Sequence, residues 1–310
     1  MEEKIEIMNL LQSKQVLEHE LQSLAYGSVE IRENESNKYI YVHYREDGVA
    51  LTKYVGEYSD ELYNLVLNNS IKAKQLKKQI REITKKLKQL NYTEEELSEK
   101  VEQNIDFAKR HLVDTIYKQA ILEGVATTFA DTGSIIEGGK VNNMTSEDIL
   151  KIVNLKHAWE FILNKNVILS DTNFALLCEI NKMVEEGFYY TAGKVRNTPV
   201  TIGGTTWKPD LPIESVIKEE LEEIFNKELN DVDRAIEILL YTMKKQVFID
   251  GNKRTAVIYS NHYLISKGKG IIAIPAELTQ EFKDLLIPYY EGKDEDKIRE
   301  FIKEKCYMEI

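Results

Sequence analysis

The sequence predicts a mostly α-helical protein in which a small α-β-β-β-α unit precedes a larger helical domain. Two patterns carry the prediction. Apolar residues recur at helical spacing through most of the 310 residues, and three short aromatic or β-branched runs cluster between residues 29 and 55. A third pattern, the Gly-, Thr- and Pro-containing segment 193–211, interrupts the helices and predicts a protruding β-hairpin centred on residues 200–207.

The N-terminal unit is predicted to end near Asn91. Residues 1–26 carry apolar positions at helical spacing, and residues 29–31, 39–44 and 49–55 form a three-stranded meander separated by turns at 34–37 and 46–48. A second helix begins after Ser59, which is followed by two acidic residues. Its coiled-coil seam, expected to pack on the first helix, consists of Leu76, Ile80, Ile83, Leu87 and Leu90.

The second domain is predicted over residues 92–310. A capping box of Thr93 and Glu96 starts a helical pattern that runs to residue 130, and residues 131–139 break it. Further helices are predicted from Thr145, over 171–186, 213–229 and 231–245, from Gly251 to about residue 266, and through a C-terminal extension at 276–310.

Composition limits where the protein acts. The net charge of −11 argues against wholesale nucleic-acid binding, although a local basic patch could survive it. No stretch approaches 18 apolar residues. The acidic N-terminus does not resemble a signal peptide, and the two cysteines make no disulfide framework. We therefore expect a cytoplasmic protein with no membrane and no nucleic acid among its partners.

Two features of the N-terminal unit allow more than one interpretation. Eight Lys and Arg residues lie between Lys72 and Lys88, opposed only by Glu82. They form either a stripe for nucleic acid or an acidic partner, or the solvated face of a helix, and we favour the solvated face. The tyrosine-rich strands, whose neighbours are acidic, are interpreted as an interaction or homodimerisation element.

The segment from Gln246 to residue 256 carries the chemistry. A Gly-containing loop that opens a helix offers free backbone N–H groups and a positive dipole end to an anion. Arg254, one turn into that helix, can meet phosphate oxygens, Asp250 can hold a divalent ion, and Phe248 would anchor the loop in the core. The alternative is a plain helix–loop–helix connection with Arg254 in a surface ion pair.

Residues Gln246 to Arg254, Gln-Val-Phe-Ile-Asp-Gly-Asn-Lys-Arg, resemble the signature of the Fic family, His-x-Phe-x-Asp/Glu-Gly-Asn-Gly/Lys-Arg. Two further segments agree in order. Residues 133–138 resemble the family's inhibitory helix motif, Ser/Thr-x-x-x-Glu-Gly/Asn, and residues 193–203 resemble its flap hairpin. The resemblance covers about residues 112–275.

The resemblance implies a helical protein that binds ATP with Mg²⁺ and transfers AMP to a Ser, Thr or Tyr hydroxyl of a target protein. In the motif loop 246–257, Asp250 would bind the metal, and the nucleotide would be bound by Gly251, Asn252, Lys253 and Arg254. Glu137, in an inhibitory segment at about 115–140, would reach into the nucleotide site. The flap, about 192–211, would hold the target by strand addition through Val200, Thr201, Ile202 and Gly203.

The sequence departs from the family pattern at its central position. The family histidine deprotonates the target hydroxyl, whereas a carboxamide such as that of Gln246 has no proton-accepting form at neutral pH. Natural loss of activity, an altered reaction, an inactivating change and a base supplied from elsewhere all remain open. His262 is more consistent with a packed or surface position than with a substitute base.

Two further departures affect the reaction and its control. Lys253 makes the motif resemble the Doc toxin branch, which implies phosphoryl transfer. Val257 stands where the family often has a second Arg, and Gly133 replaces a hydroxyl residue, so Glu137 could pair with Arg254 or simply cap a helix. We expect an adenylyltransferase-like enzyme weakened by Gln246; an inactive nucleotide-binding adaptor and a Doc-like phosphotransferase are the alternatives.

Overall fold

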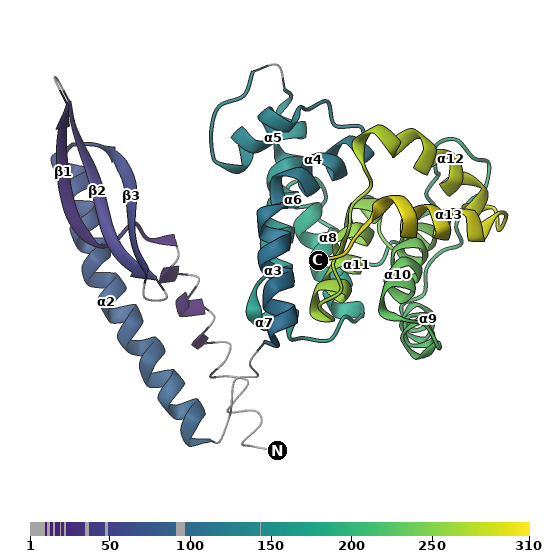
Figure 1. Cartoon of the computed structure of the whole chain (residues 1–310), viewed down its shortest axis with the longest axis horizontal. Helices are drawn as coiled ribbons and strands as arrows, with labels where there is room; N and C mark the ends of the chain where they lie inside the picture. The colour runs from purple at the N-terminus through teal and green to yellow at the C-terminus, as the bar shows by residue number, and fades with distance from the viewer. Residues whose placement is uncertain are drawn as a thin grey trace. The chain divides into compact units, whose positions relative to one another are not determined.

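The computed structural model of the chain divides into two compact units, Met1–Glu95 and Glu96–Ile310 (Figure 1). It describes residues 10, 13, 14, 16–18, 20, 21, 23–34, 37–46, 49–90, 97–142 and 144–310. Most of the predicted helix at 1–26 lies outside these residues, as do the capping box at 93–96 and the junction near residue 91. The described positions between Leu10 and Ser23 are helical.

The first unit is built on an antiparallel meander, as predicted. Strands β1 (Ser28–Asn34), β2 (Asn37–Glu46) and β3 (Val49–Glu57) pair in the order β1-β2-β3. Alternate residues of β2, Ile40 and Val42, are fully buried and pack against Val66 of the helix α2 (Asp60–Gln89). Ser59 caps α2 through its hydroxyl, which accepts a hydrogen bond from the Leu62 N–H at 3.1 Å.

The second unit is helical, and its helices stop and start more often than the sequence pattern suggests. The single helical run predicted over 93–130 is wrong. It contains α3 (Glu99–Arg110) and α4 (Leu112–Leu122), which meet at His111, and the start of α5. The predicted break at 131–139 is also wrong, because α5 extends from Phe129 to Ile136, started by the hydroxyl of Thr128. A continuous apolar pattern cannot show where the axis of the helix changes direction.

The remaining helices follow the predicted order. They are α6 (Ser146–Ile162), α7 (Lys165–Ile168), α8 (Phe174–Val184), α9 (Glu214–Asn226), α10 (Asp231–Lys245), α11 (Asn252–Ser266), α12 (Thr279–Tyr290) and α13 (Glu295–Phe301). The 3₁₀ turn Ala276–Leu278 precedes α12, and a π-helical turn, Ile302–Cys306, follows α13. The short strands β4 (Ile271–Ile272) and β5 (Tyr307–Met308) pair antiparallel and tie the C-terminal extension to the end of α11.

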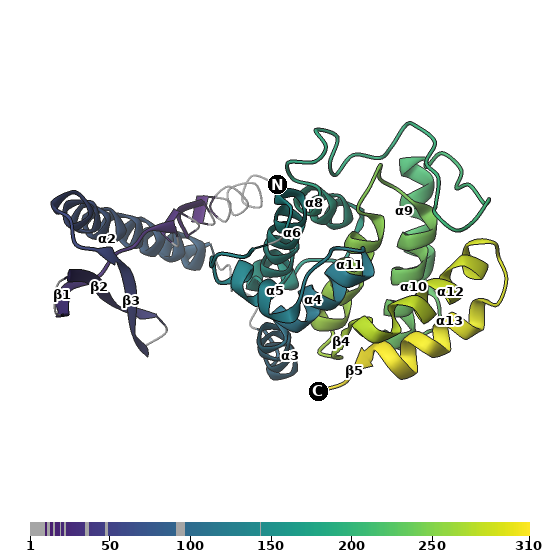
Figure 2. The same cartoon turned by 90° about the horizontal axis from the view of Figure 1, so that it is seen from above.

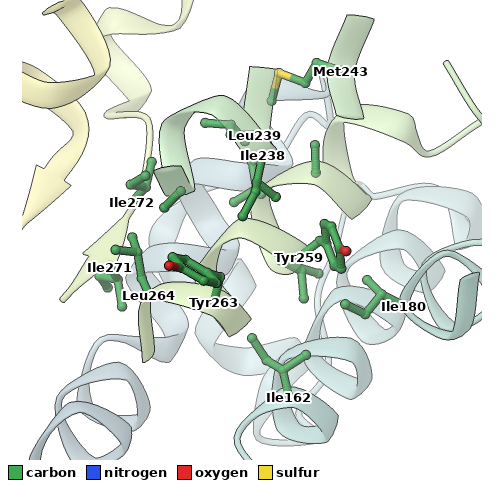
Figure 3. Packing of buried hydrophobic residues seen from close by; sticks show 14 of the residues in the cluster. Ile162, Ile180, Ile238, Leu239, Met243, Tyr259, Tyr263, Leu264, Ile271 and Ile272 are labelled. Carbon is green, nitrogen blue, oxygen red and sulfur yellow. The ribbon is translucent and has the colours of Figure 1, made fainter. Parts of the chain in front are cut away.

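Helix α11 is the centre of the second unit. Twelve consecutive residues, from Arg254 to Ile265, are buried on every side of the helix. Figure 2 shows α11 among α4, α6, α8 and α10. Figure 3 shows the side chains that meet there, including Tyr259, Tyr263 and Leu264 of α11, Ile238 and Leu239 of α10, Ile180 of α8 and Ile162 of α6. A helix packed on all sides has little freedom to move, so the start of α11 is held in a fixed position.

The segment predicted as a β-hairpin flap contains no strand. Residues 192–211 are turns and irregular chain, with a turn at Gly203 and Gly204. Trp207 stacks on Tyr290 with ring centroids 5.8 Å apart, and the Thr205 hydroxyl donates to Glu291 at 2.8 Å. These side chains fix the segment to α12 and its end instead of leaving it to pair with itself. Trp207 is therefore a packing residue.

Candidate functional site

The predicted motif loop connects α10 to α11 and is tied down by a buried arginine. The Nε atom of Arg196 donates to the Gln246 carbonyl at 2.6 Å, and its backbone N–H donates to the Val247 carbonyl at 2.9 Å. The same guanidinium also donates to the carbonyls of Thr198 and Asp210, which flank residues 199–209 of the flap segment. Arg196 is 2% exposed, so one side chain fixes the flap and the motif loop relative to each other.

The Asn252 side chain holds the loop by two hydrogen bonds to the Phe248 backbone. Its Oδ1 accepts from the Phe248 N–H at 3.0 Å, and its Nδ2 donates to the Phe248 carbonyl at 2.8 Å. Phe248 itself is 1% exposed, which confirms that it anchors the loop in the core. The carboxamide of Asn252 therefore supports the loop from within.

Both polar atoms of the Gln246 side chain form hydrogen bonds, one to the end of α10 and one to Asn252 at the start of α11. Its Nε2 donates to the Met243 carbonyl at 2.6 Å, and its Oε1 accepts from Asn252 Nδ2 at 3.2 Å. The residue ends α10 in the left-handed conformation, with φ of 49°. Gln246 therefore stabilises the turn that leads into the loop.

The N-terminus of α11 has no side-chain cap. Gly251 is the N-cap residue, with φ of 72°, and no side chain of the described residues accepts from the first-turn N–H groups. The Asp250 carboxylate turns to the Gly251 N–H, at 2.7 Å, and its side chain remains 52% exposed. The first turn of α11 thus keeps the free N–H groups and positive dipole end that favour an anion.

Arg254 lies at the centre of a buried charge cluster. Its Nη2 is 2.8 Å from Glu185 Oε1 and 3.7 Å from Asp250 Oδ1, while its Nε is 3.7 Å from Glu123 Oε2. Arg254 is 3% exposed and Glu185 2% exposed. Nevertheless, Arg254 Nε and Nη1 are buried without a hydrogen-bond partner among the described residues. The alternative of a plain surface ion pair is thereby excluded for Arg254.

The two glutamates come from segments that the sequence did not single out. Glu185 ends α8, and Glu123 ends α4, where it also lies 3.3 Å from Lys253 Nζ. Burial raises the pKa of the Glu185 carboxyl to about 7 although Arg254 opposes this, and the nearby Asp250 and Glu123 raise it further. The cluster as a whole contains three carboxyl groups, those of Glu185, Asp250 and Glu123, and two cations, Arg254 and Lys253.

A second layer of side chains positions this cluster. The Nε2 of Gln119 donates to the Arg254 carbonyl at 2.7 Å, and Gln119 in turn accepts from the Trp159 indole N–H at 2.9 Å. The Nδ2 of Asn181 donates to the Asp250 carbonyl and to the Thr255 hydroxyl, both at 3.1 Å. These hydrogen bonds join α4, α6 and α8 to the start of α11.

Other predicted residues lie away from the cluster. Glu137 caps α5, is exposed, and makes no ion pair with the described residues. His262 is fully buried; its ring nitrogens lie 2.8 Å from the Val167 carbonyl and from the Thr172 hydroxyl. His262 is therefore a packed residue, as the sequence favoured. Of the flap residues, Thr201 and Gly203 are exposed, whereas Val200 and Ile202 are half-buried.

The residues present fit a magnesium ion only in company with a ligand. Within the described residues, no group of three His, Cys, Asp or Glu side chains could hold a metal ion. Mg²⁺ is commonly bound by one or two carboxylates together with substrate phosphates and water. The half-exposed Asp250 carboxylate beside the free helix N-terminus suits that arrangement.

None of the described helices has the length and hydropathy needed to cross a bilayer.

The fold is similar to several solved structures. A Fic domain containing signaling protein from Bacteroides thetaiotaomicron VPI-5482 matches with a TM-score of 0.52 and 19% identity, over 61% of this chain and 75% of that chain. A Fic-1 fragment from C. elegans matches with a TM-score of 0.53 and 16% identity, over 78% and 79%. A Fic family protein from Desulfovibrio desulfuricans G20 matches with a TM-score of 0.52 and 11% identity, over 68% and 73%.

Sequence comparison agrees over a shorter region. A search of curated proteins found no match. Residues 171–264 match the model of the Fic/DOC family, a range that contains α8, the flap segment, the motif loop and nearly all of α11. The helical second unit has the Fic fold, and residues 171–264 within it match the Fic/DOC family model.

Proposed function

We propose that this protein binds ATP with magnesium at the start of α11 and slowly transfers AMP to a Ser, Thr or Tyr hydroxyl of a target protein. The observation that carries this proposal is Arg254, a buried guanidinium whose Nε and Nη1 have no hydrogen-bond partner among the described residues. It lies one turn inside a helix whose N-terminus has no side-chain cap from the same part of the chain. An unsatisfied buried donor costs about 1–3 kcal/mol, and phosphate oxygens would satisfy both donors.

The polar residues of the loop and Phe248 have distinct roles in this proposal. The first-turn N–H groups of α11 and the Arg254 guanidinium bind phosphate oxygens, and Lys253 adds positive charge at the same end of the helix. Asp250 holds the magnesium ion, which would supply charge neutralisation at the phosphates. Phe248 and Asn252 keep the loop in shape.

The reaction joins the target hydroxyl oxygen to the α-phosphorus of ATP. The bond from the α-phosphorus to the bridging oxygen of the β-phosphate breaks, and pyrophosphate leaves. The hydroxyl proton passes to solvent, because the Gln246 carboxamide cannot accept it. A general base typically contributes 10²–10⁴-fold, so the transfer is slow; a loose transition state keeps it from stopping altogether.

The flap segment is the proposed site for the target. Its backbone at Val200, Thr201, Ile202 and Gly203 is not paired in a sheet, so its N–H and C=O groups are available to an extended peptide. Arg196 binds the flap backbone on both sides of these four residues and also the motif loop, which would bring the bound peptide close to the nucleotide.

The test is incubation of the purified protein with ATP, magnesium and a cell lysate, followed by mass spectrometry of modified proteins. AMP adducts are expected. Phosphate adducts would instead support Doc-like phosphoryl transfer, the alternative suggested by Lys253. The absence of any adduct, also with the Gln246→His variant, would rule out transfer.

One observation favours a second candidate, a catalytically inactive nucleotide-binding adaptor. Both polar atoms of the Gln246 side chain form hydrogen bonds within the protein, to Met243 and Asn252, as in a purely structural residue. Calorimetry with ATP and magnesium separates the candidates from a protein that binds no nucleotide. Binding without adducts would support the adaptor, and no binding by wild type, Glu123→Gln or Glu137→Gly would rule out both.

A further inference from the structure

Helix α2 of the first unit concentrates positive charge in a chain of net charge −11. Between residues 72 and 88 there are eight Lys or Arg and one acidic residue, Glu82. Two of the eight take part in the fold, since Lys72 forms an ion pair with Glu20 and Lys77 lies 4.6 Å above the ring of Tyr26. The rest need another explanation.

Five of these cations form a single line along the helix, which we call the basic row. It consists of Lys74, Lys78, Arg81, Lys85 and Lys88. The spacing of 4-3-4-3 places them on one face of α2, and all five are exposed. Ala73, Leu76 and Leu87, on another face, are buried. At 1.5 Å per residue the row is about 21 Å long.

The basic row is not accounted for by the stability of the helix. Like charges three or four residues apart destabilise a helix by about 0.2–0.5 kcal/mol per pair, and the row contains four such neighbours in succession. The helix dipole favours cations only in the last turn, which explains Lys86 and Lys88 but not Lys74, Lys78 or Arg81. Among the described residues, the only ion pair of the row is Lys78 with Glu82 at 3.9 Å.

Three helices of the second unit show the usual arrangement. The lysines of α6, α8 and α9 each have an acidic residue three or four positions away, as in Lys151–Glu147, Lys182–Glu179 and Lys218–Glu214. A row of five cations with one ion pair among the described residues therefore favours a polyanionic partner over an ordinary solvated face.

The side chains around the basic row indicate which class of polyanion it can bind. A membrane-surface helix needs an exposed apolar face, but the large exposed apolar residues of α2, Leu65, Leu67 and Ile71, all precede the row. Single-stranded nucleic acid stacks on aromatic rings, and the row has none. A protein partner usually supplies or needs apolar and aromatic anchors, which the row also lacks. A duplex presents its phosphates outward in a line and needs only cations.

We propose that the basic row of α2 binds the phosphate backbone of a nucleic-acid duplex without reading its base sequence. This reverses the expectation drawn from the overall acidity, because the positive charge is segregated on one face. Affinity comes from counterion release, so it is modest and falls steeply with salt. The inference stands independently of nucleotide binding at α11.

The test uses fluorescence anisotropy of the full chain with a labelled DNA duplex of about 30 base pairs and mixed sequence, over a range of salt concentrations. An RNA duplex of equal length tells which duplex is preferred. The triple variant Lys74→Gln/Arg81→Gln/Lys85→Gln removes three charges while keeping good helix formers. The control Lys109→Gln/Lys140→Gln/Lys305→Gln removes the same charge at exposed positions of the second unit.

The wild type and the control should bind alike. The row variant should bind at least about 10-fold more weakly at low salt, and the slope of log affinity against log salt should fall by about 0.9 for each phosphate that the variant no longer neutralises. Circular dichroism checks that α2 is intact. Three results would overturn the proposal: no binding to either duplex at about 50 mM salt, equal weakening in both variants, or binding to phosphatidylserine vesicles but to neither duplex.

Discussion

The Nη2 atom of Arg254 lies 2.8 Å from the Oε1 atom of Glu185, and both side chains are almost wholly buried. The pair links the end of α8 to the first turn of α11. Because Nε and Nη1 of Arg254 have no hydrogen-bond partner in the described part of the chain, Glu185 holds the guanidinium in place without satisfying it. Removal of either charge alone leaves the other buried, which typically costs about 3–5 kcal/mol.

The Glu185 carboxyl should make stability depend on pH. Its pKa is raised by burial to about 7 in the folded protein, against an ordinary value of 4.5. The folded state therefore holds this proton more tightly, so the contribution is complete below about pH 4.5 and is lost as pH rises through about 7. The loss is at most about 3 kcal/mol. In Glu185→Gln, which does not titrate, this part of the pH dependence should disappear.

Urea unfolding at several pH values measures the effect. Both tryptophans, Trp159 and Trp207, lie in the second unit, so their fluorescence reports that unit alone. Glu186→Gln, at the adjacent exposed position, is the matched control and should keep the wild-type pH profile. An unchanged profile in Glu185→Gln would show that Glu185 does not titrate in this range.

Glu123 should compete with phosphate for the cations of the loop. Its carboxylate lies 3.3 Å from Lys253 Nζ and 3.7 Å from Arg254 Nε, so a bound phosphate would have to share or displace it. We expect Glu123→Gln to bind ATP with magnesium about 5–10-fold more tightly, which corresponds to about 1–1.4 kcal/mol. Isothermal titration calorimetry measures the change.

Glu137→Gln is the comparison, because Glu137 is the residue that the family resemblance predicts as inhibitory. It is exposed and makes no ion pair with the described residues, so its variant should bind ATP like the wild type. Tighter binding by Glu137→Gln but not by Glu123→Gln would mean that α5 reaches the nucleotide site in another conformation.

The parts of the fold and the site that could be predicted are those marked by residues close together in the sequence. Asp231 and Lys245 were the expected ends of α10, and Gly251 the expected start of α11, because acidic first turns and a loop glycine mark helix ends. The meander followed from alternating β-branched and aromatic residues between turns. The role of Phe248 followed from one apolar residue inside a polar loop.

The carboxylates around Arg254 were missed because their positions depend on tertiary packing. Glu123 and Glu185 are distant in sequence from the loop and sit at the ends of α4 and α8. One signal was present: Glu123-Gly124 repeats the Glu-Gly pair at 137–138, fourteen residues earlier. Nothing in the sequence distinguishes Glu185 from the adjacent Glu186. The Gly-, Thr- and Pro-containing pattern of the flap predicts a hairpin. A local pattern cannot show that Trp207 and Thr205 instead contact Tyr290 and Glu291 at the end of α12.

Gln246→His should restore a general base to the loop. Histidine is among the residues that tolerate the left-handed conformation, so φ of 49° at this position is no obstacle. If the protein transfers AMP, we expect the rate to rise by about 10²–10⁴-fold with little change in ATP affinity. Single-turnover assays with labelled ATP measure the rate.

Gln246→Asn is the control, because asparagine also tolerates this conformation but cannot accept a proton. Its transfer rate should not exceed that of the wild type. An equal increase in both variants would mean that a looser loop, rather than a base, limits the wild-type rate.

Gly251→Ala should destabilise the second unit by more than the conformational strain alone. Gly251 has φ of 72°, and an added Cβ would lie 2.3 Å from Glu185 Oε1. Gly292 has φ of 75° with nothing within 4 Å of its Cβ position, so Gly292→Ala measures the strain without the clash. The left-handed conformation costs about 1–2 kcal/mol, and we expect Gly251→Ala to lose about 2 kcal/mol more. Urea unfolding followed by tryptophan fluorescence gives both values.

The excess should depend on the Glu185 side chain, since that carboxylate is what the new methyl group meets. In a Glu185→Ala background, Gly251→Ala should cost about as much as Gly292→Ala, because the clash is gone and only the strain remains. If the excess persisted in that background, the need for glycine would arise from the loop backbone itself, and Glu185 would not be the side chain that excludes a Cβ from residue 251.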